Sequence, residues 1–214
     1  MNAEDILNRG VEFHMQGQLE QAIADYTQVI DSPSEEHGPW IPVALYHRGM
    51  VYHQQKQFEL AMADFSQIIE CRSGISDEVV AHALSMRGGC FIALEQFESA
   101  VSDYSEMIEN LSAIPRQMVI DALFSRGMAY DHQEQFELSI ADLSDVIESS
   151  NENALPTESL ASAHFHRGQA YRQQGQMDLA IVDLKTAFAT NALGNAGQQA
   201  VREMLEEWGE EAPG

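Results

Sequence analysis

Five arginine and five aspartate residues recur along this 214-residue sequence in matched pairs. Each arginine is followed by a glycine, and an aspartate comes fifteen residues after that glycine. The pairs are Arg9 and Asp25, Arg48 and Asp64, Arg87 and Asp103, Arg126 and Asp142, and Arg167 and Asp183. A guanidinium and a carboxylate can form a charge-assisted ion pair, whereas a row of unpaired guanidiniums could bind an anion or act in catalysis. Because each arginine has its own aspartate at a fixed spacing, we favour the ion pairs.

The elements that must position these pairs are helices. The Arg-Gly dipeptides are spaced by 39, 39, 39 and 41 residues, which indicates an internal repeat. Apolar and small residues follow helical spacing around a break, as in the second repeat with Leu45, Gly49, Tyr52, Phe58, Ala61, Phe65 and Ile68. The break falls near Lys56, where the first and last repeats carry Gly17 and Gly175, a residue type that ends helices. Each repeat is therefore predicted to be an antiparallel helical hairpin, and the five hairpins must stack to cover their apolar faces.

The hairpin geometry predicts where each ion pair lies. The arginine and the aspartate of one repeat are equally far from the turn, at about 12 Å for a rise of about 1.5 Å per residue. We expect the two side chains to face one another within a hairpin or across neighbouring hairpins. We call the row of five ion pairs the ladder. Losing one partner of a pair while the other stays buried would cost about 3–5 kcal/mol. We expect the ladder to specify the register of the hairpins.

Six residues of the second repeat resemble the markers of the tetratricopeptide repeat, in a subtype with arginine before the glycine and aspartate before the aromatic residue: Leu45, Gly49, Tyr52, Ala61, Phe65 and Ile68. One departure is the period, 39 residues here and 34 in that family. The resemblance implies an all-α, right-handed superhelical α-solenoid of five antiparallel hairpins plus a C-terminal capping helix. We expect a single domain over residues 1–209, with repeats at about 3–32, 42–71, 78–110, 117–149 and 157–190.

The C-terminal segment is predicted to cap the last repeat. Ala200, Val201, Met204, Leu205 and Trp208 share one helical face, and acidic residues occupy the other. A helix over about 196–208 would cover the apolar end of the stack, as terminal repeats require. Residues 210–214 are expected to be disordered.

The resemblance also implies a function, because members of this family bind peptides or partner proteins in a groove lined by first helices. The groove positions carry over to Leu7, Val11, His14, Tyr46, Met50, His53, Ser85, Ile92, Phe124, Met128, Asp131, Phe165, Gln169 and Arg172, with His132 adjacent. Aromatic, methionine and histidine side chains suit a neutral or basic peptide with apolar anchors. Two alternatives stay open: single positions could pack on the next repeat, and the chain could be a self-associating structural scaffold, a homo-oligomer.

Composition argues against other classes of function. The formal net charge of -23 disfavours nucleic acids and anionic membranes as partners. We find no apolar run of membrane-spanning length, no signal peptide, and only two cysteines, Cys71 and Cys90, so we expect a cytoplasmic protein. The sequence has no metal-ligand, phosphate-loop or nucleophile motif, so we expect no enzyme, no cofactor and no metal.

Overall fold

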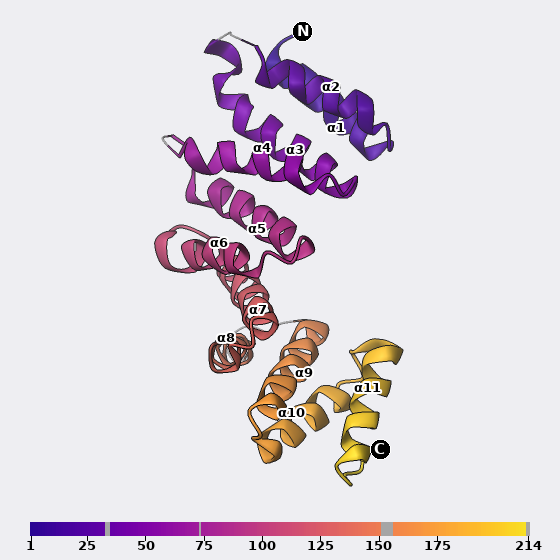
Figure 1. The fold of residues 1–214 in the computed structure, drawn as a ribbon. Coiled ribbons are helices and arrows are strands. Elements are labelled where there is room, and N and C mark those ends of the chain that lie inside the picture. The colour runs from indigo at the N-terminus through magenta and orange to yellow at the C-terminus, as the bar shows by residue number, and fades with distance from the viewer. Residues whose placement is uncertain (33–34, 73, 151–155, 213–214) are drawn as a thin grey trace. The chain divides into compact units, whose positions relative to one another are not determined.

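The computed structural model describes residues 1–32, 35–72, 74–150 and 156–212, and these residues form helices joined by short connections (Figure 1). Three hairpins pair α1 (Ala3–Met15) with α2 (Leu19–Ile30), α3 (Ile41–Gln54) with α4 (Phe58–Glu70), and α5 (Asp77–Ala93) with α6 (Phe97–Asn110). Two more pair α7 (Arg116–His132) with α8 (Phe136–Ser150) and α9 (Thr157–Gln173) with α10 (Met177–Ala189), and α11 (Gly194–Glu207) follows. A short 3₁₀ helix, η1 (Glu35–Trp40), precedes α3. The predicted all-α fold of five hairpins and a C-terminal helix is confirmed.

Each hairpin turns at one residue with a left-handed backbone. The φ angles at this position are 73° for Gly17, 60° for Lys56, 57° for Glu95, 58° for Glu134 and 72° for Gly175. In each hairpin the amide of the residue just before the second helix donates to a carbonyl of the first helix, as where Gln57 N donates to Tyr52 O at 2.8 Å. This bond satisfies a carbonyl that the end of the helix leaves without a partner. The break predicted near Lys56 is therefore a helix C-cap that recurs in all five hairpins.

The glycine of each Arg-Gly dipeptide lies where the two helices of a hairpin come closest. A Cβ atom on Gly49 would lie 2.7 Å from Phe65 Cε1, and one on Gly88 would lie 2.8 Å from Tyr104 Cζ. Real Cβ atoms do not approach other atoms so closely, so a larger residue would push the aromatic ring out of its place. The large side chain that follows each aspartate thus packs directly on the glycine of the facing helix.

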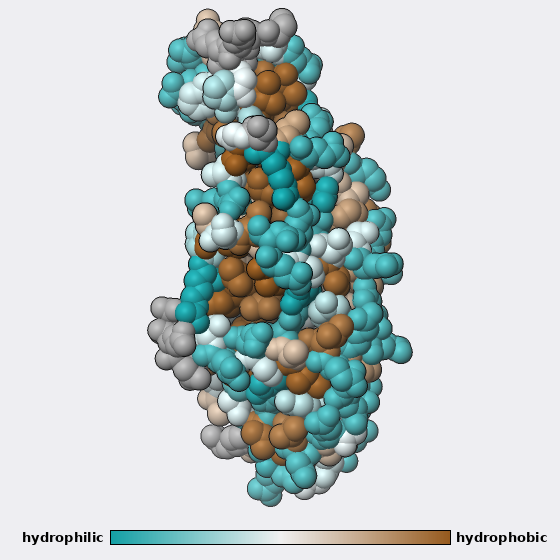
Figure 2. All heavy atoms as spheres, turned by 90° about the vertical axis from the view of Figure 1, so that its left-hand side faces the viewer, coloured by the Kyte–Doolittle hydropathy of each residue, from teal (hydrophilic) through white to brown (hydrophobic). Residues whose placement is uncertain are grey.

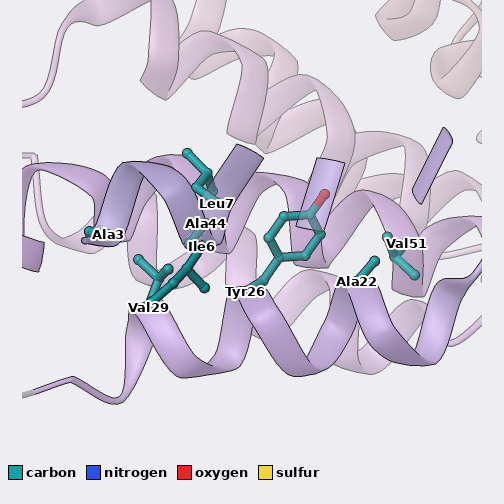
Figure 3. Close-up of a cluster of buried hydrophobic side chains, with 8 residues drawn as sticks. All are labelled: Ala3, Ile6, Leu7, Ala22, Tyr26, Val29, Ala44 and Val51. Atoms are coloured by element: carbon teal, nitrogen blue, oxygen red, sulfur yellow. The ribbon is translucent and has the colours of Figure 1, made fainter. Parts of the chain in front are cut away.

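The core of the first hairpin shows how the apolar faces are covered. Eight buried residues form one cluster, drawn in Figure 3: Ala3, Ile6, Leu7, Ala22, Tyr26, Val29, Ala44 and Val51. They come from α1, α2 and α3, so the second hairpin completes the core of the first. Trp40 and Val43 pack against the same cluster from η1 and α3. A hairpin therefore depends on its neighbour for part of its hydrophobic burial.

The chain divides into two compact units, Met1–Pro115 with α1 to α6 and Arg116–Gly214 with α7 to α11. Within the first unit α2 packs on α3 and α4 on α5, and within the second α8 packs on α9 and α10 on α11. The predicted repeat bounds and the single domain over residues 1–209 stay predictions.

The helix α11 closes the apolar end of the fifth hairpin. Val201 and Leu205 are fully buried against Leu184 of α10. At the start of the tail, Glu210 Oε2 accepts from Lys185 Nζ at 2.6 Å, and Ala212 packs against the same cluster. The disorder predicted for residues 210–214 stays a prediction, and residues 213–214 lie outside the described residues.

The face of the molecule drawn in Figure 2 is mainly hydrophilic, and hydrophobic residues gather on it in separate patches. Exposed large apolar side chains include Leu60 on α4, Leu138 on α8, and Leu179 and Val182 on α10. No helix in the described ranges is long and apolar enough to cross a membrane.

Candidate functional site

Each predicted arginine lies against the predicted aspartate of its own hairpin. In all five pairs Nε and Nη2 of the arginine donate to the two carboxylate oxygens, with N–O distances between 2.5 and 2.9 Å. The five aspartates are at most 6% exposed. This two-bond geometry is the strong form of the guanidinium–carboxylate pair, and it joins the two helices of one hairpin. The contact is within hairpins, which decides between the two arrangements that the sequence leaves open.

A third contact of the arginine, which the sequence analysis did not identify, reaches the preceding hairpin. Nη1 of Arg48 donates to Thr27 Oγ1 at 2.8 Å, and Nη1 of Arg87 donates to Ser66 Oγ at 2.9 Å. In the second unit Arg167 Nη1 donates to Ser144 Oγ, also at 2.9 Å. The signal was present in the sequence, because a serine or threonine stands two residues after the aspartate in each of the first four repeats. These hydroxyls fix the register between hairpins.

In the second to fifth hairpins the guanidinium also lies over an aromatic ring one turn along its own helix. The distance from the arginine Cζ to the ring centroid is 5.9 Å for Arg48 over Tyr52, and 5.8 Å for both Arg126 over Tyr130 and Arg167 over Tyr171. Such cation–π contacts add to the ion pair. The guanidinium is thus held by a carboxylate and a ring in these hairpins, and a hydroxyl also contacts it at Arg48, Arg87 and Arg167, so this row is built as a structural element.

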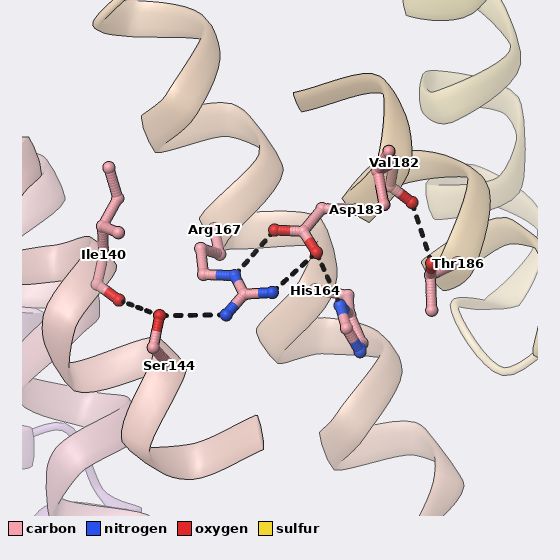
Figure 4. Close-up of polar contacts among 7 residues, drawn as sticks. All are labelled: Ile140, Ser144, His164, Arg167, Val182, Asp183 and Thr186. Atoms are coloured by element: carbon pink, nitrogen blue, oxygen red, sulfur yellow. Dashed lines mark hydrogen bonds and ion pairs between the residues drawn. The ribbon is translucent and has the colours of Figure 1, made fainter. Parts of the chain in front are cut away.

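The fifth hairpin adds a histidine to its ion pair (Figure 4). His164 Nδ1 lies 2.8 Å from Asp183 Oδ1, so Asp183 contacts both Arg167 and His164. Burial raises the pKa of Asp183, but the hydrogen bonds from Arg167 and His164 more than offset it and hold that pKa below its ordinary value. At the equivalent position the second, third and fourth repeats have Leu45, Leu84 and Leu123.

Replacing His164 with leucine should raise the pKa of Asp183, because one of its two hydrogen-bond partners is lost. A carboxylate with a depressed folded pKa stabilises the fold above its unfolded pKa, and this stabilisation is lost as the pH falls through the folded pKa. The variant should therefore begin to unfold at a higher pH than the wild type on acidification. Carboxyl-carbon NMR of Asp183 through a pH titration measures the shift, and an unchanged titration would contradict the assigned role of His164.

The structure places the predicted groove residues in different environments. Leu7 is a correction: it is only 4% exposed, because η1 and α3 lie against α1 and enclose it in the core. Two others, His132 and Arg172, are exposed. The rest are half-buried: Val11, His14, Tyr46, Met50, His53, Ser85, Ile92, Phe124, Met128, Asp131, Phe165 and Gln169.

Several of the half-buried aromatic residues contact neighbouring hairpins. The ring centroid of Tyr46 lies 5.9 Å from that of His82 on the next first helix. The ring centroid of Phe124 on α7 lies 5.9 Å from that of His166 on α9, and Phe165 contacts the same His166 ring from within α9, at 5.2 Å. At these positions part of the side chain holds neighbouring first helices together, as the alternative reading of the sequence expected.

Five of the predicted groove residues line one pocket in the second unit. This Met128 pocket has a volume of about 350 Å³ and lies between α7 and α9, beside the start of α8. Its lining includes Met128, Asp131, His132, Gln169 and Arg172 from the predicted set. Phe136 and His166 add aromatic surface to the wall, and Ala170 and Gln173 complete the lining. A concave, partly apolar pocket with a few polar groups is the usual form of a binding site.

The polar groups of the Met128 pocket have distinct charge states. Burial raises the pKa of Asp131, although the nearby Ser139 hydroxyl and His132 partly offset this. Asp131 Oδ1 and Ser139 Oγ are buried, and among the described residues neither has a hydrogen-bond partner with good geometry. Burial lowers the pKa of His166, which favours its neutral form. The pocket thus combines an acid, a neutral imidazole and the guanidinium of Arg172.

The helix α11 holds Arg172 at the edge of this pocket. Its guanidinium lies 5.5 Å from the ring of Trp208 and 3.6 Å from a carboxylate oxygen of Glu207. Within the described residues, no group of three or more histidine, cysteine, aspartate or glutamate side chains could hold a metal ion. The arrangement offers contacts for binding.

Comparison with known protein families gives two matches. Residues 8–76 and residues 161–192 each match the tetratricopeptide repeat family. The two matches cover the first two hairpins and the fifth. No curated protein sequence matches the chain.

Solved structures with the same fold are similar over most of their length. A MamA double mutant has a TM-score of 0.70 at 15% identity, covering 91% of this chain and 97% of that chain. MamA from Desulfovibrio magneticus RS-1, residue 41 to the end, has a TM-score of 0.69 at 16% identity, covering 90% of this chain and 97% of that chain. YrrB, described as a TPR protein with an unusual peptide-binding site, has a TM-score of 0.68 at 19% identity, covering 91% of this chain and 89% of that chain. At these identities the likeness concerns the fold.

Proposed function

Because this chain is a tetratricopeptide repeat protein, a member of a family of protein-interaction modules, we propose that its first helices α7 and α9 bind a peptide or a helix of a partner protein. The observation that carries the proposal is the Met128 pocket, since five residues chosen from the sequence line it together. The binding is proposed to be non-catalytic.

The chemistry of the pocket suits a peptide side chain with apolar surface. Met128 and Phe136 provide polarizable and aromatic contact area, and methionine adapts to ligands of different shape. Gln169 and the carboxylate of Asp131 offer hydrogen bonds to a peptide backbone or to polar side chains. An apolar residue of the partner would therefore enter the pocket while its backbone bonds to the rim.

The charge of the protein sets a preference among peptides. With 34 acidic and 11 basic residues, the protein attracts neutral or basic segments and repels acidic ones. YrrB, whose fold is similar, is described as having a peptide-binding site, which supports a peptide as the class of ligand.

Replacing Met128 with glutamine should weaken the binding of such peptides about tenfold, because the amide keeps the size of the side chain but removes its apolar contact, a loss of about 1.4 kcal/mol. Peptides selected from a random displayed library against the wild-type chain supply the ligands. Their affinities for wild type and variant are measured by fluorescence polarisation.

The matched control is Met177→Gln, the same exchange at a 38% exposed residue of α10 in the same unit. It should leave the affinities within about twofold of the wild type, and circular dichroism should show that both variants stay folded. Equal affinities for the Met128→Gln variant and the wild type would place the peptide site elsewhere.

A further inference from the structure

A second pocket opens between the same first helices at their N-terminal ends. This Asp121 pocket has a volume of about 360 Å³ and is lined by α7, α8 and α9. Ile120 and Val146 are 4% and 1% exposed and form its apolar base, and Phe124 adds an aromatic surface. The volume is at the lower end of the range for ligand pockets, so it suits one long side chain.

The rim of the Asp121 pocket is acidic. Two exposed carboxylates, Asp121 on α7 and Glu158 on α9, belong to the lining, together with the hydroxyls of Ser125, Ser159 and Ser162. Asp121 Oδ1 accepts a hydrogen bond from the neutral amide of Gln117 at 2.9 Å, which leaves its charge in place. In the part of the chain that the structure describes, neither carboxylate is paired with a basic side chain. The pocket therefore combines an apolar base with uncompensated negative charge and several acceptors.

We infer that the Asp121 pocket binds an arginine side chain of the partner peptide, an inference that rests on the proposed function. The methylene groups of arginine can cover an apolar surface such as that of Ile120 while the charged end stays at the rim. A guanidinium has five N–H donors and no acceptor, and the oxygen atoms of the two carboxylates and three hydroxyls in the lining can accept hydrogen bonds from it. The Phe124 ring adds a surface on which a guanidinium can stack. The Met128 pocket is less suited to arginine, because Arg172 lines it.

The two pockets lie on one face of α7, which sets the spacing of the residues that fill them. The residues that α7 contributes to the two pockets follow one helical face, at i, i+3, i+7 and i+10. Asp121 and Phe124 line the Asp121 pocket, and Met128 and Asp131 line the Met128 pocket. Their centres are about eight residues apart on the helix, or about 12 Å at a rise of about 1.5 Å per residue. An extended peptide covers this distance with about four residues, at about 3.3 Å each. The partner segment therefore has an arginine four residues from an apolar anchor.

The test uses a synthetic peptide, Ac-Leu-Ser-Gly-Ser-Arg-Ser-Gly-Ser-Leu-amide, which places a leucine four residues from arginine in either direction. Its binding to the full chain is followed by amide chemical shifts at about 0.15 M salt, where long-range attraction between exposed charges is screened. The comparison peptide has citrulline, an uncharged isostere, in place of arginine. The variants are Asp121→Asn and Glu158→Gln, and the matched control is Glu137→Gln, which removes one exposed charge on α8.

We expect the arginine peptide to shift the amides around both pockets, and the citrulline peptide to bind about tenfold more weakly. Asp121→Asn and Glu158→Gln should each weaken the arginine peptide severalfold and leave the citrulline peptide unchanged, and Glu137→Gln should affect neither. If both peptides bind equally and only Met128→Gln weakens them, the arginine inference is wrong and the proposed function stands. If neither peptide shifts the amides of α7 and α9, both are wrong. Shifts spread over the acidic surface, with equal losses in all three charge variants, would also overturn the inference.

Discussion

Replacing Asp64 with alanine should lower the free energy of unfolding of the unit Met1–Pro115 by about 3–5 kcal/mol. Asp64 is 2% exposed and holds Arg48 through two hydrogen bonds of 2.7 and 2.9 Å. The side chain of Arg48 is itself only 14% exposed, and the hydrogen bond to Asp64 raises the pKa of its guanidinium. Without its carboxylate the charged guanidinium stays in an environment poor in water, which accounts for the size of the loss.

Hydrogen exchange of the amides in α3 and α4 measures this loss, because it resolves local stability in a chain with two compact units. The matched control is Glu59→Ala, which removes an exposed acid from the first turn of the same helix α4 and should cost no more than about 1 kcal/mol. The double variant Arg48→Met with Asp64→Leu should recover most of the stability, because it removes both charges together. Equal losses for Asp64→Ala and Glu59→Ala would mean that the ion pair is solvated and contributes little.

Replacing Leu205 with alanine should destabilise the fifth hairpin by about 2–5 kcal/mol. Leu205 has no exposed surface and packs in the cluster of Leu184 and Val201 that joins α10 to α11. Truncating it removes apolar contact and leaves a cavity at the end of the stack. The same change should weaken peptide binding in the Met128 pocket, because Glu207 at the end of α11 and Trp208 just after it contact Arg172.

Hydrogen exchange again gives the readout: protection should fall in α10 and α11 and change little in α7. Glu206→Ala is the control, since Glu206 is the exposed neighbour of Leu205 on the same helix. It should change stability by no more than about 0.5 kcal/mol. A loss spread evenly over the second unit would show that α11 is not a local cap and that the unit unfolds as one body.

The arrangement separates stability from binding. The arginines are engaged by their aspartates between the two helices of each hairpin, and the pockets use other residues of the first helices, such as Met128 and Asp121. A change in a pocket residue is therefore expected to alter binding with a small effect on folding. A change in an ion pair of the ladder is expected to lower stability and to have a small effect on binding.

The sequence by itself determined the helical hairpins, the place of each turn and the partner of each arginine. These features follow from local geometry: a helix rises a constant distance per residue, so Arg48 and Asp64, equally far from a turn at Lys56, meet at the same height. A single residue in a left-handed conformation is sufficient to close each hairpin.

Only the tertiary structure decided which first-helix residues can reach a ligand. Leu7 holds a groove position in the sequence but is buried, because η1 folds over α1, and Phe124 contacts His166 from the next first helix. The bond from Arg48 to Thr27 and the two pockets between α7 and α9 likewise depend on how side chains from neighbouring hairpins pack together. That packing is set by the shapes and charges of both neighbours at once, whereas the periodicity of one repeat reports only on its own two helices.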